Sequence, residues 1–398
     1  MSIHETTGHK DSVEPLDATV LFDGRALDGG SITGIGRYSV QCIETCLAID
    51  PAIDFSMIMR PGVDCPFEGH PRVTQQAFPA SANSWIDQAF MRYVLDFEGI
   101  DLYHGPANVL PWQGLPVPAV MTLHDLLWIR DENLQTDIWW RDKVTGAFYR
   151  VFVPRAIEQA DHLLTVTHSV ADEIVERFDK PRDQITVSPN GVDPFFRPVD
   201  SEQGWSEISQ WLDPGTPFVL IVGRGAPYKN HAVALESFIE AFGTDDEMHL
   251  LMIRTRGLGS DRRFRQLLSD FSGSDRVVIT RDVTAEQLRA FYSLSELLLF
   301  PSVYEGFGLP ILEAMACGTP VVTANYGAMQ EVADDAAICV DPGNSSELAD
   351  AMISIVEQEE LAERLVDKGK ARAQTFGWER TGRRVHAAYR RLLADSAD

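Results

Sequence analysis

Two glutamates that lie eight residues apart, Glu305 and Glu313, are the residues of this chain best placed to do chemistry. An apolar run, Leu297–Phe300, predicts a strand, and the loop Glu305–Gly308 that follows it contains two glycines. Pro310 suits the first turn of a helix, so Glu313 falls about one turn inside that helix. The free N–H groups at the start of a helix favour a phosphate, whereas the carboxylates favour hydroxyl groups. The segment therefore predicts a site for a sugar nucleotide.

Two cations, Arg224 and Lys229, follow a second apolar run, Phe218–Val222. The chain has only six lysines, so a lysine in a loop directly after a strand is unlike general surface charge. We predict that this pair neutralises a diphosphate leaving group, because the negative charge of that group grows in the transition state.

The loop before the first helix contains Gly34, Gly36 and Arg37, and it follows a predicted strand at Thr19–Phe22. Ser39 stands where a dinucleotide fingerprint would have its third glycine, so the loop does not predict an NAD site. We expect it to lie against the diphosphate or the acceptor, or else its glycines serve only a tight turn.

Two histidines end predicted strands on the same sheet edge. His124, followed by Asp125, ends Ala119–Leu123, and His104 ends Asp101–Tyr103. Because open parallel sheets bind ligands at the carboxyl ends of their strands, His124 is a candidate site residue and His104 a weaker one.

Four segments resemble, in order and spacing, the GT4 group of retaining glycosyltransferases of the GT-B fold. Phe300–Thr323 resembles the signature with paired glutamates, and Val117–Asp125 resembles the strand that ends in His-Asp. Val187–Asp193 resembles the interdomain crossover, and Val222–Asn230 resembles the phosphate-binding loop with its Arg and Lys. Together with the fold pattern around them, these segments span about residues 19–393.

The resemblance implies roles for individual residues. Glu305 would hold the hydroxyls of the donor sugar and stabilise positive charge at its anomeric carbon, and Glu313 would bind the ribose hydroxyls. The residues expected in catalysis are His124, Arg224, Lys229 and Glu305. The residues expected to bind the donor are Gly34, Gly36, Arg224, Lys229, Glu305, Gly306, Phe307, Gly308, Leu309 and Glu313. The residues expected to bind the acceptor are Arg37, His104 and Asp125.

The expected reaction moves a hexose from a nucleoside-diphosphate sugar to a saccharide or lipid-linked saccharide, in polysaccharide, O-antigen or exopolysaccharide biosynthesis. GDP-mannose is the favoured donor, because the Gly-Ile-Gly-Arg-Tyr and His-Asp segments look most like those of mannosyltransferases. UDP-glucose and related donors stay open, as does a non-catalytic protein that binds sugar nucleotides. No cofactor and no metal are expected, since no Asp-x-Asp pair lies at the predicted donor cleft.

The composition, 44% hydrophobic and 23% charged residues, is that of a globular enzyme. A formal net charge of −25 argues against nucleic acid as a partner. No run reaches 18 apolar residues, and the polar N-terminus lacks the apolar core of a signal peptide. We therefore expect a cytoplasmic protein, with five reduced cysteines.

Strand-like and helix-like segments alternate twice along the chain, which predicts an α/β protein with two Rossmann-like, doubly wound parallel-sheet domains facing a cleft. We expect a disordered tail (1–17), an acceptor domain (18–195), a donor domain (196–375) and a final segment (376–398). The GT-B resemblance implies that the helix in this last segment packs back on the first domain.

The segment Trp139–Arg155 interleaves aromatic and basic residues on a predicted helix. Phe148, Phe152 and Arg155 fall within about 40° of Arg141 at helical spacing. Two interpretations stay open. The stripe faces the core with cations at its edge, or it receives a lipid-linked acceptor or touches the inner face of the membrane.

Overall fold

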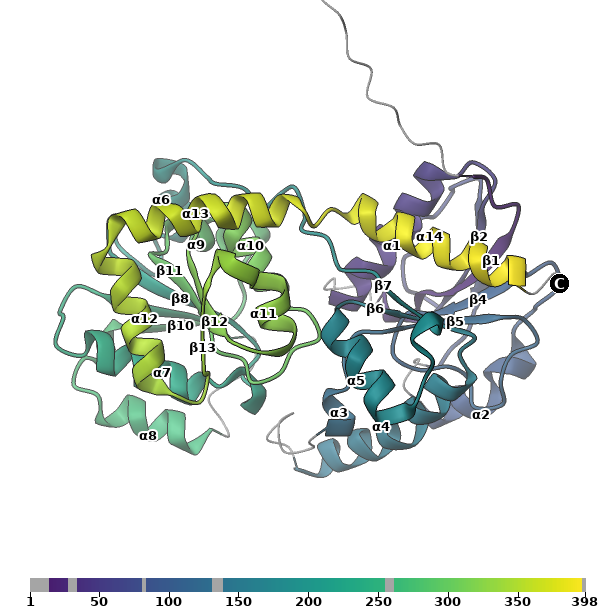
Figure 1. Ribbon diagram of the computed structural model, residues 1–398, viewed down its shortest axis with the longest axis horizontal. Helices are drawn as coiled ribbons and strands as arrows, with labels where there is room; N and C mark the ends of the chain where they lie inside the picture. The colour runs from purple at the N-terminus through teal and green to yellow at the C-terminus, as the bar shows by residue number, and fades with distance from the viewer. Residues whose placement is uncertain (1–13, 28–33, 81–83, 131–138, 255–260, 396–398) are drawn as a thin grey trace, which may run out of the picture.

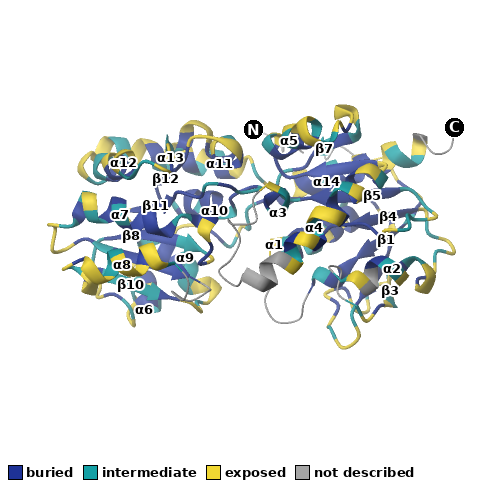
Figure 2. Cartoon of the chain, turned by 90° about the horizontal axis from the view of Figure 1, so that it is seen from below, coloured by how far each residue is buried: buried dark blue, intermediate teal, exposed yellow. Residues whose placement is uncertain are grey.

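A computed structural model of the chain describes residues 14–27, 34–80, 84–130, 139–254 and 261–395. It consists of two α/β domains side by side, and helices cover both faces of each sheet (Figure 1). Figure 2 shows the sheets as buried layers, with the exposed residues on the surrounding helices and loops. The predicted fold is confirmed.

The N-terminal domain is built on a parallel sheet of seven strands in the order β3-β2-β1-β4-β5-β6-β7. Its strands are β1 (Thr19–Asp23), β2 (Asp54–Met59), β3 (Val73–Ala77), β4 (Leu102–Gly105), β5 (Ala119–Leu123), β6 (His162–Thr165) and β7 (Ile185–Val187). Its helices are α1 (Gly34–Ile49), α2 (Trp85–Val94), α3 (Leu127–Arg130), α4 (Trp139–Gln159) and α5 (His168–Phe178).

The C-terminal domain has a parallel sheet of six strands in the order β10-β9-β8-β11-β12-β13. Its strands are β8 (Phe218–Gly223), β9 (His249–Arg254), β10 (Val277–Thr280), β11 (Leu297–Phe300), β12 (Val321–Ala324) and β13 (Ile338–Val340). Its helices are α6 (Ser201–Ile208), α7 (His231–Phe242), α8 (Arg262–Asp270), α9 (Ala285–Leu294), α10 (Leu309–Cys317), α11 (Gly327–Ala333), α12 (Ser345–Glu357) and α13 (Glu359–Gln374).

The sequence patterns missed the strands β3 and β7 and the helices α3, α6, α8, α11 and α13. The strand β3 pairs only with β2 at the sheet edge, and its sequence Val-Thr-Gln-Gln-Ala lacks an apolar run. The strand β7 has only three residues. The helix α13 is largely polar because most of its surface faces solvent, with Leu365, Gly369 and Ala373 on its buried side.

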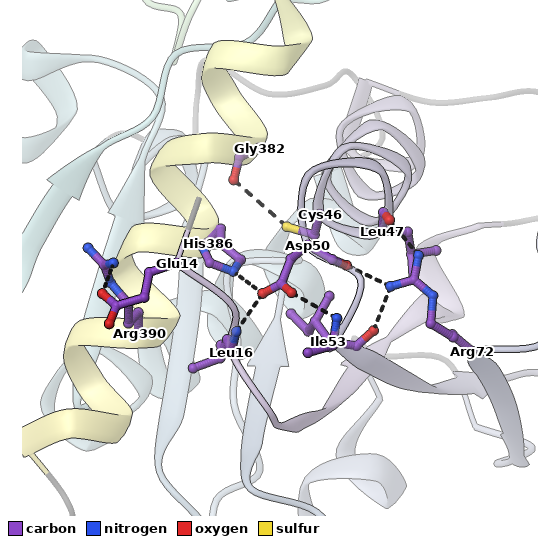
Figure 3. Close-up of polar contacts among 11 residues, drawn as sticks. Glu14, Leu16, Cys46, Leu47, Asp50, Ile53, Arg72, Gly382, His386 and Arg390 are labelled. Carbon is purple, nitrogen blue, oxygen red and sulfur yellow. Dashed lines mark hydrogen bonds and ion pairs between the residues drawn. The ribbon is translucent and has the colours of Figure 1, made fainter. Parts of the chain in front are cut away.

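The last helix, α14 (Trp378–Asp395), crosses back and packs along α1, as the resemblance implied (Figure 1). Gly382 permits this close approach, because a Cβ there would lie 2.3 Å from the Cβ of Thr45. In the same contact, His386 Nε2 lies 2.6 Å from Asp50 Oδ2, which also accepts a hydrogen bond from the Leu16 N–H (Figure 3). Of the predicted tail, residues 1–13 lie outside the described residues, and Leu16 is packed in the core.

Both sheets change winding direction between a central pair of strands. In the first sheet these are β1 and β4, and in the second they are β8 and β11. The loops that leave the carboxyl ends of such strands diverge and leave a crevice, so ligands bind there in open α/β sheets. The loops after β8 and β11 begin the predicted donor site. Within the described residues, none of the helices is both long and apolar enough to cross a lipid bilayer.

Candidate active site

The loop between β11 and α10 has the backbone geometry of a ligand-binding turn. Gly308 precedes the helix with φ +97°, a conformation that side-chain-bearing residues rarely adopt. No side chain caps the start of α10, so its first N–H groups lack a side-chain acceptor. Phe307 and Leu309 turn their side chains toward the apolar core of the domain. The backbone of this loop, together with Glu305, therefore forms the part that a donor would meet.

The first glutamate, Glu305, forms an ion pair with Lys229 inside the C-terminal domain. The distance between Lys229 Nζ and Glu305 Oε1 is 2.5 Å, and the two side chains are only 10% and 14% exposed. The ammonium group also lies 4.7 Å from the centre of the Phe300 ring. The sequence assigned these two residues to different parts of the donor, and the structure places them in direct contact.

The second glutamate, Glu313, is buried on α10 and binds partners from both domains. Its Oε2 accepts a hydrogen bond of 2.9 Å from the Tyr292 hydroxyl, and its Oε1 lies 3.3 Å from Arg37 Nη1 of the N-terminal domain. Burial raises the pKa of Glu313, while the Arg37 guanidinium and the Tyr292 hydroxyl act in the opposite direction. Arg37, predicted to bind the acceptor, thus joins α1 to the donor site.

Arg224 comes directly after β8, and its side chain is exposed. Beyond it lies a cavity of about 260 Å³, lined by Gly225, Ala226, Pro227, Asn230, Ala232, Arg254, Asp261 and Arg262. Arg224 is therefore accessible to a ligand at the edge of the sheet, and the cavity adjoins the loop that carries Lys229.

The two domains touch at Gly306. A Cβ at this position would lie within 1.8 Å of the His124 carbonyl oxygen, so only glycine fits. The Gly306 carbonyl in turn accepts a hydrogen bond of 3.0 Å from Thr167 Oγ1. Leu127 of the N-terminal domain packs against Tyr228 and Tyr304 of the C-terminal domain. The structure thus brings the His-Asp segment and the donor loop together.

His124 is neutral at physiological pH, because burial lowers its pKa to about 4. Its Nε2 lies 2.9 Å from the Pro106 carbonyl oxygen and must donate to it, which leaves Nδ1 as an acceptor. Burial, together with the smaller effect of the Glu305 and Glu173 carboxylates, raises the pKa of the neighbouring Asp125 to about 6. A polar pair with shifted pKa values therefore lies on the N-terminal side of the contact.

His104 lies away from this contact, in the interior of the N-terminal domain. It is fully buried, and its ring nitrogens lie 2.6 Å from the Tyr389 hydroxyl and 2.7 Å from Thr122 Oγ1. Burial lowers its pKa to about 3. Both ring nitrogens are engaged, so the structure argues against the prediction that His104 binds the acceptor and gives it a role in holding α14.

The remaining predicted residues lie at the start of α1. Gly34 is its exposed first residue, and Gly36, two residues further along, is buried. Residues 28–33 of the predicted loop lie outside the described residues. No group of three or more potential metal ligands was found among the residues that the structure describes.

Sequence reasoning missed residues that position the site. Tyr292 binds Glu313, and Tyr304 donates a hydrogen bond of 3.0 Å to Glu173 Oε2 across the domain contact. Tyr304 directly precedes Glu305, and that adjacency was the available signal. Nothing in the sequence around Tyr292 connects it with Glu313, 21 residues away.

The fold and this site define a glycosyltransferase. The family model of glycosyl transferases group 1 matches residues 206–372, and that of Glycosyltransferase Family 4 matches residues 56–195. The two models together span most of both domains. The chain therefore belongs to this group of glycosyltransferases, with the GT-B fold.

Individual relatives agree with this assignment. O-antigen chain mannosyltransferase B of Escherichia coli is 26% identical over 395 residues, which cover 91% of this chain and 97% of that protein. A D-inositol 3-phosphate glycosyltransferase of Acidothermus cellulolyticus is 30% identical over 290 residues, covering 70% and 63%. The solved structure of sucrose-phosphate synthase from Thermosynechococcus elongatus superposes with a TM-score of 0.73 at 24% identity, covering 95% of this chain and 100% of that one. That structural likeness shows the fold.

Proposed function

We propose that this glycosyltransferase moves a hexose, with mannose as the first choice, from a nucleoside-diphosphate sugar to a saccharide or lipid-linked saccharide acceptor with retention of configuration. The observation that carries the proposal is the close pairing of Glu305 with Lys229 beside the uncapped start of α10. The mannosyl donor is supported by likeness to the E. coli O-antigen mannosyltransferase along nearly the whole chain.

The diphosphate, the ribose and the base of the donor would each bind a different part of the site. The diphosphate would lie between the N–H groups at the start of α10, Lys229 and the exposed Arg224. The ribose hydroxyls would bind Glu313, and the base would enter the cavity of about 260 Å³ next to the segment Gly225–Asn230. Donor binding would thereby use the C-terminal domain, with Arg37 reaching the site from the other domain.

The reaction breaks the bond between the anomeric carbon and the diphosphate oxygen, and the diphosphate leaves with the electron pair. Arg224 and Lys229 neutralise the charge that develops on it. The carboxylate of Glu305 stabilises the positive charge on the sugar, and an acceptor oxygen attacks from the face that the diphosphate leaves. A phosphate oxygen takes the acceptor's proton, so no metal and no covalent sugar–enzyme intermediate are needed.

Contact between the two domains would exclude water during this step. The contact at Gly306 brings His124 and Asp125 of the acceptor domain against the loop of Glu305. Exclusion of water strengthens each electrostatic interaction in the site. We place this reaction in the cytoplasm, on an acceptor that belongs to polysaccharide, O-antigen or exopolysaccharide assembly.

The first test is a thermal-shift screen with GDP, UDP, ADP and dTDP and their common sugars. A ligand at about 100 times its Kd stabilises a protein by roughly 2.7 kcal/mol, which moves the midpoint by a few degrees. We expect GDP and GDP-mannose to give the largest shifts, and NMR of the transfer product to show an anomeric configuration like that of the donor. A larger shift with UDP-glucose would change the donor, and binding without transfer to any acceptor would favour a sugar-nucleotide-binding protein without activity.

A further inference from the structure

The chain crosses between the two domains twice, and the two crossings lie against each other. The first crossing follows β7, and the second joins α13 to α14 (Figure 1). The Val192 N–H donates a hydrogen bond of 2.9 Å to the Phe376 carbonyl, and a Cβ at Gly191 would collide with the backbone of Trp378. We call these two segments, residues 188–193 and 375–377, the hinge. They are packed backbone against backbone, so they move together if the domains change their angle.

A cavity of about 210 Å³, which we call the hinge cavity, lies against these segments. Its lining includes Val166 of the acceptor domain, Pro189 of the hinge and Phe307 of the donor loop. Cavities that hold drug-sized ligands start at about 300 Å³, so this one suits a smaller molecule than a nucleotide. Because its walls belong to both domains, the shape of the cavity depends on the angle between them.

Three arginines line the hinge cavity, Arg372 of α13 and Arg380 and Arg384 of α14. Arg380 and Arg384 are four residues apart, so they lie on one face of α14. Arg380 Nη1 donates to the Thr375 carbonyl at 3.2 Å, and Arg384 Nη1 donates to the Val187 carbonyl at 2.6 Å. A guanidinium group has five N–H donors, so one bond to a carbonyl fixes each side chain and leaves donors for a ligand.

No carboxylate balances the charges of Arg380 and Arg384. Neither arginine forms an ion pair with any residue that the structure describes, although the chain has 59 acidic and 34 basic residues. Glu331 also lines the cavity, but its two oxygens accept the N–H groups of His168 and Ser169, each at 2.8 Å. Burial and, to a smaller extent, the charge of Arg380 lower the pKa of Arg384. Two neighbouring cations of this kind repel each other, and a bound anion would remove that repulsion.

Another wall of the hinge cavity is aromatic. The rings of Phe307 and Phe376 pack edge to face with centres 5.9 Å apart, and the Arg372 guanidinium lies 4.9 Å from the centre of the Phe376 ring. Arg372 donates to the carbonyls of Val332 and Glu331 at 3.0 and 2.7 Å, so its main part is to hold α13 against α11. The cavity thus offers two available cations beside an apolar wall, which suits a small anion that carries a short organic group.

We propose that the hinge cavity is a second anion site of this enzyme, which binds the phosphate group of a small phosphorylated compound through Arg380 and Arg384. Arginine suits this ligand because its parallel N–H groups match two phosphate oxygens. The site is separate from the donor site, but it touches the donor loop through Phe307.

A ligand in the hinge cavity would favour the arrangement of the domains in which Gly306 touches His124, because the walls of the cavity come from both domains. Since donor binding is expected to use the same arrangement, the two ligands should strengthen each other's binding. This coupling rests on the proposed function, whereas binding of a phosphate group at the hinge does not.

The test is calorimetric titration of the full chain with inorganic phosphate and with glycerol 3-phosphate at constant ionic strength. We expect both to bind, and glycerol 3-phosphate to bind more tightly because its carbon chain contacts the aromatic wall. Tighter binding of inorganic phosphate would identify the free ion as the ligand. Each titration is repeated with a saturating nucleotide, so that the donor site is filled and only the hinge cavity is open to phosphate.

Arg380→Gln should weaken the binding of both probes by about tenfold, because it removes one charge-assisted contact. Arg380→Lys keeps the charge and should weaken binding less. Arg383→Gln is the matched control, because it removes an arginine from the same helix that pairs with Glu379 at 2.8 Å. Thermal midpoints in phosphate-free buffer show whether each variant is folded.

The affinity for nucleotide separates a hinge site from binding in the donor site. Saturating glycerol 3-phosphate should lower the Kd of the nucleotide by about fivefold in the wild type and leave it unchanged in Arg380→Gln. Phosphate that competes with the nucleotide in both proteins, or that binds the wild type and Arg380→Gln equally well, would overturn the inference. A chain that binds glycerol 3-phosphate as expected but transfers no sugar would overturn the proposed function alone.

Discussion

The two glutamates of the site differ in how their partners reach them. Glu305 pairs with Lys229, and both belong to the C-terminal domain. Glu313 pairs with Arg37, which belongs to the N-terminal domain, 276 residues earlier in the chain. The first pair therefore exists whether or not the domains touch, whereas the second forms only when they do. The Glu305–Lys229 pair is therefore formed before the domains close, and the Arg37–Glu313 pair depends on domain closure.

The largest expected effect comes from removing the carboxylate charge of the Glu305–Lys229 pair. Glu305→Gln keeps the size of the side chain, and we expect transfer to fall by about 10²- to 10³-fold, because the charge on the sugar in the transition state loses its carboxylate. The change also leaves Lys229 in a mostly buried position without its partner, so the thermal midpoint should drop.

Initial rates with saturating donor and the thermal midpoint measure both effects. Glu202→Gln, at an exposed position of α6, is the control and should change neither quantity. Turnover of Glu305→Gln near that of the wild type would show that the Glu305–Lys229 pair has no part in transfer.

Gly306→Ala disrupts the contact between the two domains. A methyl group would collide with the His124 carbonyl oxygen, so the loop and the acceptor domain must separate. We expect transfer to fall by about 10²-fold, since small misplacements of reacting groups cost that much, while nucleotide binding to the C-terminal domain is largely kept.

The split between transfer rate and nucleotide-induced thermal shift measures this effect. Gly377→Ala is the control, because a methyl group there meets no atom within 4 Å. Equal loss of nucleotide binding and transfer would mean that Gly306 acts on the donor pocket directly, without the domain contact.

Arg37→Met removes the interdomain pair alone. The Arg37 side chain is 32% exposed, but its partner Glu313 is only 10% exposed and would lose its cation, so we expect the free energy of unfolding to fall by about 1–3 kcal/mol. The KM for the donor should rise by about tenfold, because closure around the donor loses one contact. Salt at about 1 M, where the screening length is about 3 Å, should raise the KM of the wild type but hardly that of the variant. Arg197→Met, at an exposed position, serves as control, and an unchanged donor KM in Arg37→Met would contradict the role of this pair in closure.

The smallest effect on turnover is expected from Asp125→Asn, which mainly changes stability. The pKa of Asp125 is raised from 3.8 to about 6, so the folded state holds its proton while the unfolded state loses it. This carboxyl group therefore lowers the free energy of unfolding progressively as the pH rises from about 4 to 6. Above pH 6 this loss of stability remains constant. Asn keeps the acceptor for the Leu127 N–H and removes the cost, so we expect the variant to be more stable by about 1–3 kcal/mol at pH 7 and equal to the wild type near pH 4.

Thermal midpoints between pH 4 and pH 7 measure this difference. Asp172→Asn, whose side chain is 75% exposed, is the control and should follow the wild type across the range. A constant offset of Asp125→Asn at every pH would show that packing, rather than titration, causes the change.

The sequence predicted the fold and much of the donor loop because both depend on local properties. Alternating apolar runs predicted the parallel sheets, and Gly308 and Pro310 predicted where α10 begins. The sequence did not predict β3, whose polar residues pair at a sheet edge, or the burial of His104, whose partner Tyr389 comes 285 residues later. Both depend on what lies beside them in space, and no local pattern encodes that.

The sequence by itself determined the class of protein, the order of its two domains and the two glutamates with their glycine loop, because strand periodicity and the backbone freedom of glycine act within a few residues. The tertiary structure alone decided that Arg37 reaches Glu313, that Gly306 meets His124, and that Trp85 and Trp112 pack against the same ring of Phe152. Those contacts join segments far apart in the chain, and they exist only because two packed sheets fix the distances between their loops and helices.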